Sequence, residues 1–161
     1  NMTDALAVVR AFAHIDCSER REVLTDFEHK WQQDSLVMDK WFAVQATSPA
    51  AGSFKRIEAL AETLNWRNPN KFRSLIGAFA VGNPVQFHQA SGAGYRFFAN
   101  WLIRMDEANP QTAARVAGAF ETWRRYSPER QALMQAEMER VLASETLSKD
   151  MGEIVGRVLG A

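Results

Sequence analysis

The sequence predicts an all-α protein, and three observations support this prediction. Apolar residues recur at i, i+3, i+4 and i+7, which is the spacing of one face of a helix. Each of the five prolines follows an asparagine or a serine, as expected for a helix N-cap followed by proline at the first helical position. Alternation of apolar and polar residues, typical of a half-buried strand, never extends beyond a few residues. Short loops favour antiparallel neighbours, so we expect a superhelical stack of antiparallel helix pairs, armadillo- or HEAT-like, in preference to a closed bundle.

Caps and apolar stripes predict three helices before residue 48. Thr3 is the expected cap of the first helix and Ser18 that of the second. Thr47 and Ser48 interrupt the third. The three stripes consist of Leu6, Val9 and Ala13; of Val23, Leu24, Phe27 and Trp31; and of Leu36, Val37, Trp41 and Val44.

The prolines predict five helix starts. The pairs are Ser48-Pro49, Asn68-Pro69, Asn83-Pro84, Asn109-Pro110 and Ser127-Pro128. Gly82 is well placed to end the helix that begins at Pro69, and residues 83–89 are expected to form a short helix or turn. The apolar stripe after Pro69 consists of Phe72, Leu75, Ile76 and Phe79.

The C-terminal half is predicted to contain four longer helices. The first is expected to be the most buried, because Phe97 and Trp101 widen its apolar stripe. The next two are expected from Pro110 to about Trp123 and from Pro128 to Ala143, and Ser148 caps the last. The stripe of the first consists of Tyr95, Phe98, Leu102 and Met105.

Length and composition place the chain among soluble single-domain proteins. At 161 residues we expect one helical-repeat domain over residues 1–161. No stretch approaches the ~20 apolar residues that span a membrane. The single cysteine, Cys17, cannot form an internal disulfide, so a reducing, cytoplasmic location is predicted. The net charge of +0 argues against a nucleic-acid partner.

The histidines and the cysteine form no recognisable catalytic or metal-binding pattern. A zinc site of the H-E-x-x-H type needs two histidines one helical turn apart together with a carboxylate, and His14, His29 and His88 lack this spacing. Each is expected to be a surface or packing histidine. Cys17 has only His14 near it in sequence and is expected to be an inert thiol. We therefore expect no metal, no cofactor and no catalytic residue in this chain.

Two further patterns are better explained by packing than by a ligand. Gly92-Ala93-Gly94 contains the first two glycines of a dinucleotide loop, but the third glycine and the preceding strand are missing. A tight helix entry is therefore expected there, with Ser91 as the cap. Five tryptophans could stack on a ligand, yet their helical spacing favours the core. They are Trp31, Trp41, Trp66, Trp101 and Trp123.

Most of the unpaired basic charge lies between residues 67 and 115. Six basic residues stand against two acidic ones in this segment, a net charge of +4 in a chain that is neutral overall. If Pro69 and Pro110 begin helices, Arg73 lies on the first, and Gln111 and Arg115 share a face of the second. Two guanidinium groups, a carboxamide and a nearby helix N-terminus would suit a carboxylate or a peptide carbonyl. Arginines that lie along apolar stripes and pair with glutamates are an alternative that fits the same spacing.

Several separated blocks of the sequence resemble one known family. The blocks are NPNKFRSLIGAFAVGNPVQFH, SGAGYRFFANWLIRMDEANPQTAARV and RRYSPERQALMQAEMERVLAS, preceded by NMTDALA and HKWQQDSLVMDKWFAVQATSP. They resemble the C-terminal part of bacterial aminopeptidase N, and the resemblance covers nearly the whole chain. That family consists of zinc-dependent exopeptidases that remove N-terminal residues from peptides.

The resemblance implies a non-catalytic role for this chain. In the family the zinc ligands and the general base lie in a preceding catalytic domain with the H-E-x-x-H motif, which this chain lacks. The C-terminal domain is a helical stack that covers the catalytic domain of the same polypeptide and encloses the active-site chamber. Matching positions imply that Arg73, Gln111 and Arg115 face this chamber and help bind the downstream part of a peptide substrate. The alternative function is a free-standing helical-repeat scaffold that binds another protein.

Overall fold

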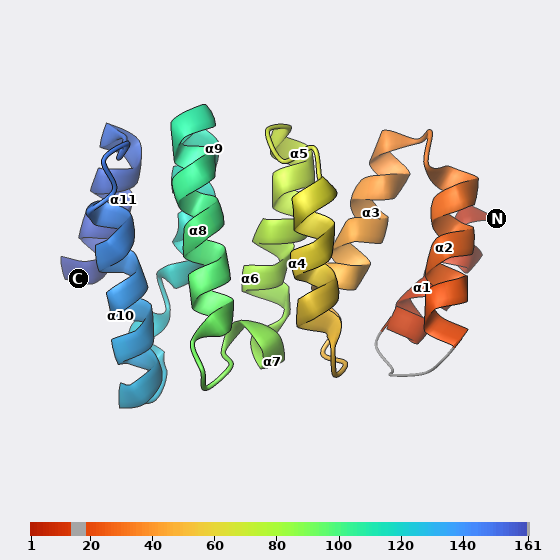
Figure 1. Cartoon of the computed structure of the whole chain (residues 1–161), viewed down its shortest axis with the longest axis horizontal. Helices are drawn as coiled ribbons and strands as arrows, with labels where there is room; N and C mark the ends of the chain where they lie inside the picture. The colour runs from red at the N-terminus through yellow and green to blue at the C-terminus, as the bar shows by residue number, and fades with distance from the viewer. Residues whose placement is uncertain (14–18, 161) are drawn as a thin grey trace. The chain divides into compact units, whose positions relative to one another are not determined.

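The computed structural model describes residues 1–13 and 19–160, and every regular element among them is a helix. α-Helices make up most of these elements, with one π-helical turn and two short 3₁₀ turns, and no strand occurs in the described ranges (Figure 1). The prediction of an all-α fold is therefore confirmed. The chain divides into two compact units, Asn1–Gln86 and Phe87–Ala161.

The N-terminal unit is built around one central helix. Its first four helices are α1 (Met2–Ala13), α2 (Glu19–Trp31), α3 (Ser35–Ala46) and α4 (Ser53–Thr63). A continuous helical run follows, made of α5 (Pro69–Phe72), a π-helical turn (Arg73–Gly77) and α6 (Ala78–Gly82). The short helix α7 (Pro84–Phe87) contains the boundary between the units, which lies after Gln86. Helix α3 packs against α1, α2, α4 and this run.

A tryptophan fixes α3 against α2 in the core of this unit. Trp41 is buried, and its indole Nε1 donates a hydrogen bond to the carbonyl oxygen of Leu24 at 3.1 Å. The predicted stripe after Pro69 is also confirmed, because its four side chains are fully buried. These are Phe72, Leu75, Ile76 and Phe79.

The C-terminal unit consists of four longer helices and two 3₁₀ turns. The helices are α8 (Ala93–Ala108), α9 (Pro110–Ala117), α10 (Pro128–Leu142) and α11 (Lys149–Gly160). Helices α9 and α10 each pack against both α8 and α11. As predicted, the stripe of α8 is completely buried, and the rings of Phe87, Phe98 and Phe120 meet at its centre.

Four of the five proline pairs begin helices as predicted. The side-chain oxygens of Asn68, Asn109 and Ser127 each accept a backbone N–H of the first turn, with proline at the first helical position. Asn83 does the same for α7, since its Oδ1 accepts from the N–H of Gln86 at 3.2 Å. The helix start predicted at Ser48 is wrong.

Ser48 is buried and has a tertiary role in place of a cap. Its hydroxyl donates to the carbonyl oxygen of Ala13, and α4 begins only at Ser53, after Gly52 in the left-handed region at φ 80°. Thr3 is not the cap of α1 either, because the helix begins at Met2 and Asn1 Oδ1 accepts from the N–H of Asp4. The predicted cap at Ser18 lies outside the described residues.

The helix predicted from Pro110 to about Trp123 is shorter than expected. Helix α9 ends at Ala117, and 3₁₀ turns follow at Gly118–Phe120 and Trp123–Arg125. Glycine is a poor helix former, which favours the end of the regular helix before Gly118. The chain then places the buried indole of Trp123 against α11, where its Nε1 donates to the carbonyl oxygen of Val158 at 3.1 Å.

Candidate functional site

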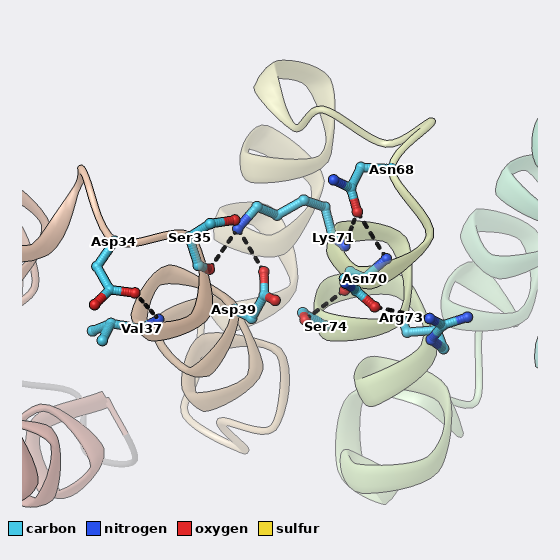
Figure 2. A network of polar contacts seen from close by, with 9 residues as sticks. All are labelled: Asp34, Ser35, Val37, Asp39, Asn68, Asn70, Lys71, Arg73 and Ser74. Carbon is cyan, nitrogen blue, oxygen red and sulfur yellow. Dashed lines mark hydrogen bonds and ion pairs between the residues drawn. The ribbon is translucent and has the colours of Figure 1, made fainter.

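Arg73 is the first of the predicted site residues, and it lies at the start of the π-helical turn. The side chain is exposed, and its Nη2 donates a hydrogen bond to Oδ1 of Asn70 at 2.9 Å (Figure 2). Among the described residues the guanidinium group pairs with no carboxylate. The alternative interpretation, in which the arginine pairs with a glutamate, therefore does not hold for Arg73 among the described residues.

The π-helical turn departs from the regular helix that the sequence predicts after Pro69. The N–H of Ala78 bonds to the carbonyl oxygen of Arg73, five residues earlier, where a regular α-helix bonds four residues back. One extra residue is thus accommodated in the turn that carries Arg73. π-Helical turns are rare, occur mostly as single turns inside α-helices, and are frequent at functional sites.

Lys71, two positions before Arg73, is committed to the fold. Its ammonium Nζ lies 2.5 Å from Oδ1 of Asp39 and 2.8 Å from the carbonyl oxygen of Ser35, so it fastens α5 to α3 (Figure 2). The Lys71 and Asp39 side chains are only 14% and 17% exposed. The positive charge of Lys71, which contributes to the basic segment in the sequence, is therefore compensated within the unit.

Gln111 and Arg115 lie on the exposed face of α9. Both side chains are exposed and one helical turn apart, so the prediction that they share a helix face is confirmed. The other face of α9 packs against α8 and α11 through small buried residues, which are Thr112, Ala113, Ala114 and Ala117. Within the described ranges neither the Gln111 nor the Arg115 side chain makes a hydrogen bond or an ion pair.

The three predicted site residues are distributed over both units. Arg73 belongs to the N-terminal unit, whereas Gln111 and Arg115 belong to the C-terminal unit. That all three face one chamber stays a prediction. At the N-terminus of α5, Asn68 already accepts the N–H groups of Asn70 and Lys71, so these two N–H groups are not available to a ligand.

A cluster around His88 was not expected from the sequence. The His88 ring stacks on Tyr126 with centroids 4.0 Å apart, and its Nδ1 lies 2.5 Å from the Tyr95 hydroxyl oxygen. Arg130 Nε donates to the carbonyl oxygen of His88 at 2.8 Å. Burial, assisted by the charge of Arg130, lowers the pKa of His88, and burial raises the pKa of Tyr95 to about 12.

The His88 cluster is a packing feature, as predicted for this histidine. Arg130 is 42 positions from His88, a separation for which no spacing rule gives a signal. His29 is exposed, also as predicted, while His14 and Cys17 lie outside the described residues. In residues 1–13 and 19–160 no three His, Cys, Asp or Glu side chains are grouped so as to hold a metal ion. No helix in those ranges is long and apolar enough to cross a membrane.

Comparison with known proteins gives a consistent result over the whole chain. A family model described as "Domain of unknown function (DUF3458_C) ARM repeats" matches residues 1–160. The chain is 45% identical over 161 residues to aminopeptidase N of Haemophilus influenzae, and 40% identical to aminopeptidase N of Caulobacter vibrioides and of Escherichia coli. These matches cover 99% of this chain but only 18–19% of each relative.

A solved structure shows the same similarity. The chain superimposes on part of a crystal structure of Legionella pneumophila aminopeptidase A in complex with aspartic acid, with a TM-score of 0.92 and 29% sequence identity. The match covers 99% of this chain and 19% of that chain. The chain thus spans about a fifth of the length of the proteins that it matches.

Proposed function

Since this chain belongs to the DUF3458_C family of ARM-repeat domains, we propose that it is the non-catalytic C-terminal domain of a zinc-dependent, cytoplasmic aminopeptidase. The whole enzyme removes N-terminal residues from peptides. In this proposal the chain covers the catalytic domain of the same polypeptide, encloses the active-site chamber and binds the downstream part of the peptide. The length relation supports it, because the matching proteins named aminopeptidase N are about five times as long.

The observation that carries the proposed substrate contact is the unpaired state of two exposed arginines. Arg73 and Arg115 have no carboxylate partner among the described residues, and the carboxamide of Gln111 lies one turn from Arg115. A guanidinium group offers five N–H donors in a planar fork that fits a carboxylate or a peptide carbonyl. Each of these side chains therefore suits a peptide carbonyl or the C-terminal carboxylate of a short peptide.

The chemistry itself belongs to residues outside this chain. The zinc ion, when bound in the catalytic domain, supplies a Lewis acid and an activated water for hydrolysis of the peptide bond. Arg73, Gln111 and Arg115 contribute by holding the peptide downstream of the bond that is cut. Contacts to a remote part of a substrate affect the rate when they orient the reacting group, even though they touch no reacting atom.

The test is a triple substitution in the full-length enzyme. Arg73→Ala, Gln111→Ala and Arg115→Ala together should lower kcat/KM for tripeptides by roughly 10- to 100-fold, through loss of charge-assisted hydrogen bonds. Hydrolysis of single-residue chromogenic amides, which have no downstream peptide, should change little. Equal and small effects on both classes of substrate would contradict the proposed contact.

A matched control removes the same chemical groups from another exposed surface. Arg96 and Arg140 are exposed arginines that share the carboxylate of Glu137, at 3.8 and 2.7 Å, and Gln135 is an exposed carboxamide on the same helix as Arg140. The triple alanine variant at these positions should leave tripeptide hydrolysis unchanged. The alternative of a free-standing scaffold would be supported if the gene encoded no upstream H-E-x-x-H domain.

A further inference from the structure

We propose that Asn70 is a positioning residue that directs the Arg73 guanidinium toward the substrate while leaving its charge uncompensated. This inference rests on the proposed function of Arg73. It assigns a role to a side chain that is not among the predicted site residues, and it explains why an exposed arginine has an amide as its neighbour. Figure 2 shows the contacts of Asn70 and Arg73.

The contact between Asn70 and Arg73 joins side chains three positions apart. Oδ1 of Asn70 accepts a hydrogen bond from Nη2 of Arg73 at 2.9 Å, so it holds one edge of the planar guanidinium group. A long exposed side chain loses rotamer freedom when it binds a ligand, and this loss weakens binding. An arginine already held in one direction loses less, which favours binding of the substrate.

Asn70 is itself fixed by its backbone. Its N–H donates to Oδ1 of Asn68 at 2.9 Å, and its carbonyl oxygen accepts the hydroxyl of Ser74 at 2.6 Å. The N–H of Arg73 also bonds to this carbonyl oxygen. The next residue, Lys71, is fastened to α3 through Asp39 and Ser35. A continuous series of contacts therefore runs from α3 to the Arg73 guanidinium.

The amide of Asn70 differs from a carboxylate in what it leaves available. A neutral carbonyl oxygen accepts from one of the five N–H donors of arginine and takes none of the positive charge. A carboxylate at the same place would form an ion pair and compete with an anionic substrate. Arg140 illustrates that case in this chain, since its Nη2 lies 2.7 Å from Oε2 of Glu137. Asn70 thus orients the guanidinium group of Arg73 and leaves its full positive charge available to an anionic substrate.

The experiment is a double-mutant cycle in the full-length enzyme, with Asn70→Ala, Arg73→Ala and both together. Asn70→Ala should lower kcat/KM for tripeptides roughly 3- to 10-fold, the size expected for one hydrogen bond. Hydrolysis of single-residue chromogenic amides should stay the same. In the Arg73→Ala background Asn70→Ala should have no further effect on tripeptides, because the side chain that it directs is gone.

Two further variants separate positioning from folding. Asn70→Asp keeps the shape and the acceptor, so its Tm should not fall, yet KM for tripeptides should rise because the new carboxylate pairs with Arg73. Asn100→Ala, at an exposed asparagine of α8, should change neither quantity. A Tm loss in Asn70→Asp or an unchanged KM would count against the role of the amide.

The remaining outcomes identify which proposal fails. If Arg73→Ala lowers tripeptide hydrolysis and Asn70→Ala does not, the inference about Asn70 is wrong and the role of Arg73 stands. If Asn70→Ala affects both classes of substrate equally, or acts equally in the Arg73→Ala background, Asn70 is only structural. If Arg73→Ala leaves tripeptide hydrolysis unchanged, the proposed function of Arg73 fails and the inference fails with it.

Discussion

The ammonium group of Lys71 lies 2.5 Å from the carboxylate of Asp39, across 32 positions of sequence, and this pair joins α5 to α3. The contact compensates one of the six basic charges between residues 67 and 115. Lys71 lies two positions from Arg73, but its charge is used within the fold, whereas that of Arg73 is not. Charge counted along a sequence therefore overestimates the charge available to a partner.

Removing one member of the Lys71–Asp39 pair should destabilise the protein more than removing both. Either Lys71→Ala or Asp39→Ala leaves a largely buried charge alone, and we expect a loss of about 1–3 kcal/mol in the free energy of unfolding. The double variant should lose less than either single variant, because it leaves no charge unpaired. Urea unfolding measures this, with Lys149→Ala as the control, because Lys149 is 88% exposed and lies 4.0 Å from Glu153. Additive losses would show that the pair is not coupled.

Trp41, in the core of the N-terminal unit, and Trp31, partly buried against that core, should respond differently to replacement by phenylalanine. Trp41 Nε1 donates to the carbonyl oxygen of Leu24, whereas the buried Nε1 of Trp31 has no partner among the described residues. Trp41→Phe removes this hydrogen bond and leaves a gap where the larger indole ring packed, and it should cost about 1–3 kcal/mol. Trp31→Phe removes an unpaired polar group and should cost less. Thermal unfolding tests this order, and a larger loss for Trp31→Phe would contradict it.

Ser148 should contribute measurably to the start of α11. Its hydroxyl accepts from the N–H of Met151 at 3.0 Å and donates to the buried carboxylate of Asp106, and its own N–H donates to that carboxylate at 2.8 Å. Ser148→Ala should lower the free energy of unfolding by about 1–2 kcal/mol through loss of the cap. Ser91→Ala, at an exposed serine with one backbone contact, is the control. Equal losses in both variants would contradict the role given to Ser148.

The His88 cluster should make stability depend on pH below neutrality. Burial lowers the pKa of His88 from 6.5 in the folded protein, so the unfolded chain binds a proton more readily. The stability from this site is therefore complete above about pH 6.5 and falls as the pH drops below that value. His88→Asn should reduce this dependence between about pH 5 and pH 7.5 in urea unfolding. His29→Asn, at an exposed histidine, should leave it unchanged.

Helix starts were predictable because their signals are local. Asn68, Asn109 and Ser127 cap within three residues of themselves, and proline at the next position cannot continue a strand or ladder. Ser48 carries the same dipeptide signal but serves a tertiary contact with Ala13, 35 positions away. A local pattern cannot distinguish these two uses of a serine hydroxyl, because the deciding partner lies elsewhere in the chain.

The sequence by itself determined the all-α class, most helix starts and the resemblance to aminopeptidase N, which the comparisons confirm. It also determined most of the buried stripes, but Leu36, predicted in the third stripe, is 71% exposed. It also placed Gln111 and Arg115 on one helix face, because side chains four positions apart on a helix always share one. The tertiary structure decided which charges are compensated, where the π-helical turn lies and what holds Arg73 in place. The physical reason is distance along the chain: caps and stripes act over a few residues, whereas the partner of Lys71 is 32 positions away and becomes its neighbour only when α5 packs on α3.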